Sequence, residues 1–154
     1  MNETKTYLKL KDKPQDNFPE KIFAHHTGGT QTNPKADTSH HTASGVEAQH
    51  IKNGWEGIGY HEFIDKEGVV WLGRPAHYHG AHVKEDGWNK KSIGICLAGN
   101  FDLTLPTGAQ EKSLAERIKY HMAKWNIPIE KVEPHRKALG NPPYKSCYGS
   151  KLAD

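Results

Sequence analysis

The sequence predicts an α/β fold, a single domain in which helices flank a central mixed β-sheet. Two apolar segments of strand length, Lys21 to Ala24 and Ile93 to Ala98, support the sheet. The third observation is a helix pattern that opens at Pro106-Thr107. Apolar residues recur in it at three-to-four spacing until Asn126 and Pro128. We expect the apolar face of this helix to pack on the sheet.

Shorter signals predict the remaining elements. Ile58 to Ile64 and Val69 to Leu72 are separated by a turn sequence, which indicates a β-hairpin. Ser44 as N-cap and Glu47 three residues later predict a helix that runs to about Lys52.

The two ends of the chain carry weaker signals. Residues 1–20 contain Pro14 and Pro19 and are predicted to be an irregular lead-in to a domain that spans 21–154. One short strand or turn is expected between Ile129 and His135. Residues 30–43, rich in Thr, Ser, Asn and His, are expected to form a loop over or beside the site.

Length and composition exclude several classes of protein. The 154 residues suit one domain. The mean hydropathy is -0.84, and no apolar run approaches the ~20 residues of a membrane helix. A formal charge of +3 with scattered Lys and Arg predicts no nucleic-acid partner. The N-terminus lacks the apolar segment of a signal peptide, so we expect cytoplasmic synthesis.

Histidine is unusually frequent, with 11 residues, and one of them ends a predicted strand. His25 stands at that strand end, and His135 and Cys147 lie far along the chain. Two imidazoles and one thiolate form a zinc ligand set that leaves the fourth tetrahedral position to water. The set is typical of a metal-dependent hydrolase. Spacing alone does not bring the three residues together, and a strand-end histidine also satisfies backbone groups. Cys96 is expected to lie in the core.

Several blocks occur along the chain in a characteristic order. They are Phe23 to Thr27, Gly54 to His61, Gly68 to Pro75, Gly80 to His82, Asn89 to Phe101, Pro134 to Arg136 and Lys145 to Cys147. Together they resemble the type 2 N-acetylmuramoyl-L-alanine amidases. That family shares its fold with peptidoglycan recognition proteins and includes small phage endolysins. The resemblance implies the peptidoglycan recognition protein-like amidase fold.

The resemblance also implies a role for individual residues. His25, His135 and Cys147 would bind one catalytic Zn²⁺, and Tyr60 and Lys145 would stabilise the oxyanion or protonate the leaving amine. Positions in or beside the substrate groove are matched by His26, Thr27, Arg74, His82 and Asn100. Trp88 adds a face on which sugar or peptide can stack. For Arg74, His82, Asn100 and Trp88 a purely structural role is the open alternative.

The implied reaction is hydrolysis of the amide between the lactyl group of N-acetylmuramic acid and L-alanine of the stem peptide. We expect a phage or prophage endolysin, a monomer that binds peptidoglycan without membrane insertion. It would reach the wall after release, from the host cytoplasm or periplasm.

Three other functions are alternatives to a lytic amidase. The first is a peptidoglycan-binding or recognition protein without activity, against which Cys147, Tyr60 and Lys145 argue. The second is a cytosolic muropeptide-recycling amidase, although such enzymes usually carry Asp in place of Cys147. The third is a regulatory binder of a host enzyme. The chain departs from the compact phage enzymes in a longer loop from His135 to Cys147, which contains Pro142-Pro143.

Overall fold

A mixed sheet lies at the centre of the protein. The structure is a computed structural model that describes residues 2–28, 33, 35–83, 85–101 and 103–134, and in this part of the chain the sheet has six strands. In spatial order these are β1 (Asn2–Glu3), β4 (Val70–Leu72), β3 (Glu62–Ile64), β5 (Ser92–Leu97), β2 (Lys21–His26) and β6 (Val132–Pro134). Only the β3–β4 pair among them is antiparallel. The predicted central mixed sheet is therefore confirmed.

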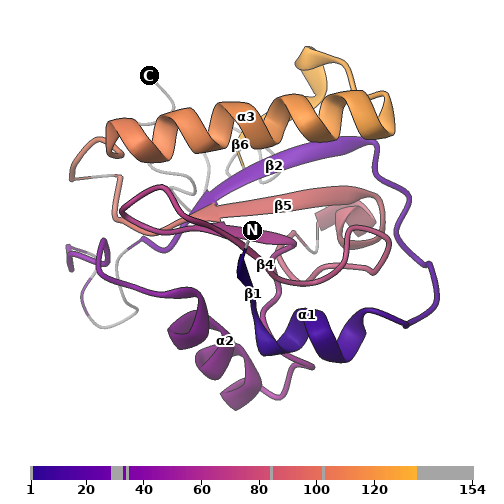
Figure 1. Ribbon diagram of the computed structural model, residues 1–154, viewed down its shortest axis with the longest axis horizontal. Coiled ribbons are helices and arrows are strands. Elements are labelled where there is room, and N and C mark those ends of the chain that lie inside the picture. The colour runs from indigo at the N-terminus through magenta and orange to yellow at the C-terminus, as the bar shows by residue number, and fades with distance from the viewer. Residues whose placement is uncertain (1, 29–32, 34, 84, 102, 135–154) are drawn as a thin grey trace.

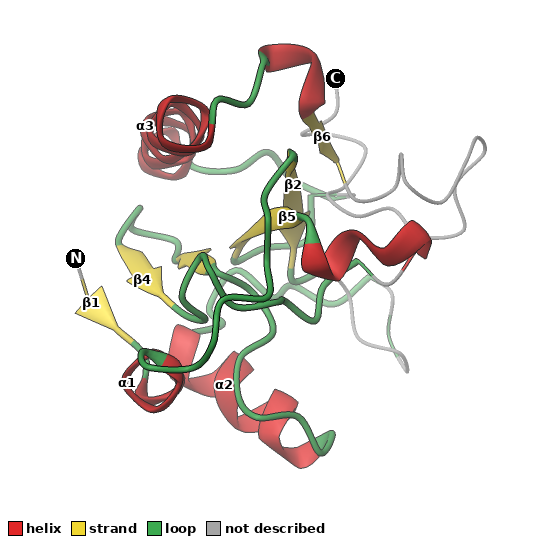
Figure 2. Ribbon diagram, turned by 90° about the vertical axis from the view of Figure 1, so that its right-hand side faces the viewer, coloured by secondary structure: helices red, strands yellow, loops and turns green. Residues whose placement is uncertain are grey.

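Helices cover both faces of this sheet. The long helix α3 (Gly108–Trp125) lies along one face, and α1 (Lys5–Leu10) and α2 (Ala43–Lys52) lie on the other, as Figures 1 and 2 show from two directions. Two short 3₁₀ segments, η1 (Glu85–Lys90) and η2 (Ile129–Lys131), precede β5 and β6. No helix among the described residues is long and apolar enough to cross a membrane.

The side chains of β5 divide between two cores. Because successive side chains of a strand point to opposite faces, Ile93, Ile95 and Leu97 join one cluster and Cys96 joins the other. The first cluster packs under α3 against Leu114, Ile118, Met122 and Trp125. The second packs under α2 and includes Ile58, Phe63 and Ala98. Cys96 is fully buried, as expected for a core residue.

The long helix agrees with its sequence signals. Thr107 is its N-cap, and the Thr107 hydroxyl and the Gln110 side chain form a capping box with each other's backbone N–H groups. The helix ends at Asn126, which adopts the left-handed conformation at φ 54°. The helix predicted from Pro106-Thr107 to Asn126 is confirmed.

The cap of α2 differs from the expectation. Thr42, not Ser44, is the N-cap, and its hydroxyl accepts from the Gly45 N–H. Glu47 forms no capping box there. It is buried and accepts from the backbone N–H and the hydroxyl of Thr6 in α1. Glu47 therefore stabilises the contact between α2 and the N-terminal segment instead of capping α2.

The hairpin is present with a shorter first strand than predicted. Only Glu62–Ile64 forms regular β-structure, whereas the segment before it makes isolated hydrogen bonds, such as that from the His61 N–H to the Gly94 carbonyl of β5. Gly59 gives the reason, because its N–H donates to His50 Nδ1 and its carbonyl accepts from Ala81. Close approach of the Ala81 carbonyl leaves no room for a Cβ at Gly59.

The N-terminal segment is more ordered than predicted. Residues 1–20 were expected to be irregular, yet β1 pairs with β4, and Thr4 caps α1 through its hydroxyl. Thr6 then joins α1 to the domain, because its hydroxyl also accepts from the Ile58 N–H at 3.2 Å. The segment is thus part of the sheet and of the α2 face. A domain boundary at residue 20 stays a prediction.

Candidate functional site

His25 lies near the carboxyl end of β2, between β5 and β6. It is 1% exposed and pairs in register with Cys96. On the other side, Ala24 pairs with Pro134, the residue that precedes His135 in the sequence. The sheet therefore carries the chain to the neighbourhood of His25 immediately before His135. His135 itself lies outside the described residues.

His25 and His26 point to opposite faces of the sheet, as strand geometry requires. The His25 ring lies on the α2 side, where its centroid is 5.2 Å from the ring of Tyr60 and 4.9 Å from that of His82. The His26 ring stacks on Phe101 at 5.8 Å, and its Nδ1 accepts from the Phe101 N–H. Of the adjacent pair, His25 is the one that faces Tyr60.

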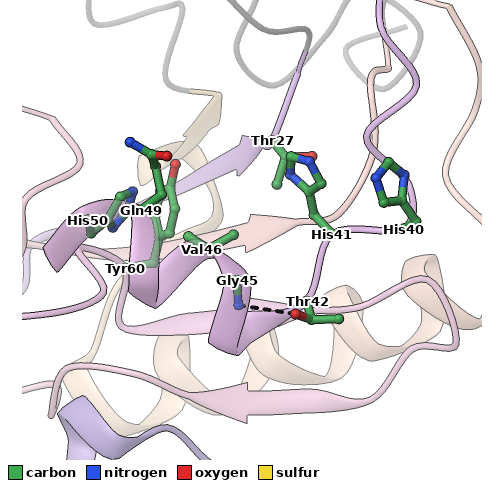
Figure 3. Close-up of a pocket in the computed structure, with 9 residues that line it drawn as sticks. All are labelled: Thr27, His40, His41, Thr42, Gly45, Val46, Gln49, His50 and Tyr60. Atoms are coloured by element: carbon green, nitrogen blue, oxygen red, sulfur yellow. Dashed lines mark hydrogen bonds between the residues drawn. The ribbon is translucent and has the colours of Figure 1, made fainter. Parts of the chain in front are cut away.

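Tyr60, which contacts His25, also lines a cavity of about 450 Å³. Such a volume lies in the ordinary range of ligand pockets. Figure 3 shows Tyr60, Gln49 and His50 on one side of the cavity and Thr27, His40 and His41 on the other. Val46, Thr42 and Gly45 of the α2 region complete its lining. The cavity therefore lies between one side of α2 and the end of β2 that carries His25.

Three histidines, His40, His41 and His50, line the cavity. The His50 Nδ1 accepts from the Gly59 N–H at 2.8 Å, and burial, with the charge of Arg74, lowers the pKa of His50 to about 4. His50 is thus neutral at pH 7. Burial, followed by the charge of His40, also lowers the pKa of His41. Sequence analysis gave none of these three a role in the site, because the cavity forms only when α2 packs beside the loop before it.

Hydrogen bonds of the Thr27 and Thr38 hydroxyl groups hold the loop before α2 against the end of the sheet. Thr38 Oγ1 donates to the Gly28 carbonyl at 2.5 Å and lies 2.7 Å from Thr27 Oγ1. Thr27 Oγ1 also accepts from the Gly99 N–H. The Asn100 side-chain amide donates to the Ala36 carbonyl. The described part of the predicted 30–43 loop, residues 33 and 35–42 before α2, therefore lies beside the site, as expected.

Comparison with known proteins now places the chain. A family model described as N-acetylmuramoyl-L-alanine amidase matches residues 15–150. The chain belongs to this amidase family. The resemblance of the ordered sequence blocks is confirmed.

Several relatives support the membership of the amidase family. Peptidoglycan-recognition protein SC2 of Drosophila melanogaster is 36% identical over 95 residues, or 61% of this chain and 50% of that protein. The endolysin of Escherichia phage T7 is 43% identical over 86 residues, or 52% of this chain and 55% of that protein. The matches thus span about half the length of these curated relatives.

Solved structures confirm the fold. The N-acetylmuramoyl-L-alanine amidase LysC from Clostridium intestinale superposes with a TM-score of 0.74 at 29% identity, over 90% of this chain and 82% of that one. The endolysin of Thermus scotoductus bacteriophage Ph2119 has a TM-score of 0.75 at 20% identity, over 97% and 91%. At that identity the second likeness concerns the fold alone.

Within the structure, several predicted groove residues have identified structural contacts. Arg74 is 4% exposed, and its guanidinium donates to the carbonyls of Ile58 and His79. Trp88 lies edge-on to Phe23, with the Lys21 and Lys91 ammonium groups 4.5 Å and 4.3 Å from its ring centroid. The substrate contacts expected of His26, Thr27, Arg74, His82, Trp88 and Asn100 stay predictions.

Part of the predicted metal and catalytic set lies beyond the described residues. His135, Lys145 and Cys147 all belong to the segment 135–154, of which the structure gives no description. In the described part of the chain, no group of three His, Cys, Asp or Glu side chains is arranged to hold a metal ion. His25 is therefore the one predicted ligand whose surroundings the structure describes.

Proposed function

We propose that this amidase is a zinc-dependent endolysin. It hydrolyses the amide between the lactyl group of N-acetylmuramic acid and L-alanine of the stem peptide. The observation that carries the proposal is the position of Tyr60, whose ring contacts His25 and also lines the 450 Å³ cavity. A residue that carries a hydroxyl donor thus contacts the expected metal ligand and lines the space available to a peptide.

The donor set suits zinc. His25, His135 and Cys147 would supply two imidazoles and one thiolate, with the fourth position open to water. His25 is buried at a strand end, and its Nε2 lies 2.9 Å from His82 Nδ1, so its ring is held. Bound zinc supplies a water molecule with a pKa near ~7 and polarises the scissile carbonyl.

The other groups of the chain would bind the substrate and move protons. The Tyr60 hydroxyl would donate to the oxygen that becomes negative when the amide is attacked, and Lys145 would share that task or protonate the leaving amine. The cavity wall of Gln49, His50 and Thr27 offers polar atoms to the stem peptide. The hydrogen bond between the Thr27 and Thr38 hydroxyl groups would hold this part of the cavity lining in place.

We further propose where the enzyme acts. It would be made in the cytoplasm and would meet peptidoglycan after release, as a monomer. The similarity to the phage T7 endolysin over 86 residues supports a lytic role. A muropeptide-recycling amidase remains a rival, and it would prefer soluble muropeptides to intact walls.

The similarity to peptidoglycan-recognition proteins supports a second candidate, a binder without activity. Cys147→Ala separates the two candidates. We expect the variant to sediment with purified cell walls as the wild type does, but to release no stem peptides, because one zinc ligand is lost. Wild-type protein that binds walls without releasing peptides would favour the binder. Full activity of Cys147→Ala would remove Cys147 from the mechanism.

A further inference from the structure

The His82 ring lies in a slot that only glycines leave open. A Cβ built on Gly94 would lie 2.5 Å from His82 Nδ1, and one built on Gly80 would lie 2.4 Å from its Cδ2. The backbone is held as well, since the N–H groups of His82 and Val83 both donate to Asn89 Oδ1 at 2.8 Å. The imidazole is therefore fixed from both sides and from its own main chain.

Both nitrogens of this ring have polar neighbours. His82 Nδ1 lies 2.9 Å from His25 Nε2, and His82 Nε2 lies 3.3 Å from Ser92 Oγ. Ser92 Oγ in turn lies 2.6 Å from the carbonyl oxygen of Trp88. The contacts form one chain from a backbone carbonyl to His25.

The carbonyl fixes the direction of every hydrogen bond in this chain. A carbonyl oxygen only accepts, so the Ser92 hydroxyl donates its single proton to Trp88. Ser92 Oγ then accepts from His82 Nε2–H, and in the neutral imidazole this makes His82 Nδ1 an acceptor. His25 must therefore carry its proton on Nε2 and its lone pair on Nδ1.

We propose that His82 is a positioning residue for His25, which selects the tautomer and ring orientation that present Nδ1 to the metal. This inference rests on the proposed function. Hydrogen bonds of this kind to the second nitrogen of a ligand histidine raise its basicity and hold its ring. The role differs from the substrate contact that the resemblance implies for His82, because the ring is directed at His25.

Two substitutions of His82 separate positioning from simple packing. In His82→Asn the amide oxygen occupies the place of Nδ1 and still accepts from His25, whereas His82→Gln reaches Ser92 and loses the contact with His25. We expect the zinc affinity, measured by competition with a chromophoric chelator, to fall about 10–100-fold in His82→Gln. The affinity of His82→Asn should stay within a few-fold of the wild type. Equal zinc affinities in the two variants would overturn the proposal.

The wild-type protein provides a test that needs no variant. Long-range ¹H–¹⁵N spectra of the histidine rings should show protons on Nε2 of both His25 and His82, with and without zinc. Ser92→Ala, which removes the acceptor for His82, should disturb this pattern, whereas His79→Gln, which removes a histidine paired with Asp16, should leave it unchanged. A proton on His25 Nδ1 would overturn the inference.

The two proposals fail in different ways. Zinc-dependent release of stem peptides together with a proton on His25 Nδ1 would overturn the positioning role alone. A wild-type protein that binds no zinc would overturn the proposed function.

Discussion

At the scale of single residues, Tyr60 connects the expected metal ligand with the cavity. Its ring lies 5.2 Å from that of His25, and it also lines the cavity wall. Sequence blocks predicted its importance, but they did not predict the contact between His25 and His82. That contact depends on Gly80 and Gly94, which lie in separate segments and become neighbours only through folding.

Removal of the Tyr60 hydroxyl should slow catalysis without loss of the fold. We expect Tyr60→Phe to lower the rate of stem-peptide release about 100-fold, the usual effect of losing one donor to a developing oxyanion. Zinc affinity and the unfolding temperature should change little, because the aromatic ring that contacts His25 is kept. A rate within two-fold of the wild type would exclude a catalytic hydroxyl.

At the scale of elements, β3 and α3 are joined by a buried charge network that sequence analysis missed. The Glu62 carboxylate accepts two bonds of 2.7 Å from Arg117 and lies 2.6 Å from His121 Nε2. Burial alone would raise the pKa of Glu62, but the bonds from Arg117 and His121 hold it below its usual range. Residues 55 or more positions apart in the sequence gave no local signal of this pairing.

The network should contribute strongly to stability. Glu62→Gln leaves the Arg117 guanidinium without its buried counter-charge, so we expect the free energy of unfolding to fall by about 3–5 kcal/mol in denaturant titrations. Glu116→Gln, an exposed change on the same helix, is the matched control and should cost less than about 0.5 kcal/mol. Similar losses in both variants would contradict a role for the buried pair.

Elements with strong local signals were predicted well, and those that depend on distant partners were not. Pro106-Thr107, the three-to-four spacing of the apolar residues and Asn126 all lie within one segment, so α3 was found with its ends. The helix α1 was missed because two of its six residues, Thr6 and Leu10, are buried, and the partner of Thr6 is the distant Glu47. The cap of α2 was displaced for the same reason.

At the scale of the whole molecule, the sheet separates a functional face from a structural one. The α2 face carries His25, Tyr60 and the cavity, whereas the α3 face holds the apolar cluster and the Glu62 network. Sequence periodicity predicted the layers. Which of His25 and His26 faces Tyr60 could be decided only from the register of the strands.

Buried histidines should make the folded protein sensitive to acid. Burial lowers the pKa of His61 to about 4, and the bond from its Nε2–H to the Tyr78 carbonyl offsets only part of this effect. Its Nδ1 accepts from the Gly94 N–H. Above pH ~6.5 both folded and unfolded His61 are neutral, so stability is unaffected. Between pH ~6.5 and 4 only the unfolded chain gains this proton, and stability should fall by up to about 1.4 kcal/mol per pH unit.

Denaturant unfolding at several pH values checks this expectation. His61→Gln keeps a donor for the Tyr78 carbonyl and removes the titrating ring, so its stability should depend less steeply on pH over the same window. Equal slopes in the variant and the wild type would show that His61 is not the group responsible.

The proposal that the chain is a metal-dependent amidase of peptidoglycan can be tested on purified cell walls. Mass spectrometry of purified cell walls digested with the wild-type protein tests it most directly, with and without a zinc chelator. We predict intact stem peptides with a free L-alanine amino terminus, which disappear on chelation and return when zinc is restored. Cleaved glycan strands with stem peptides still attached, or peptide release that chelation does not reduce, would contradict a metal-dependent amidase activity.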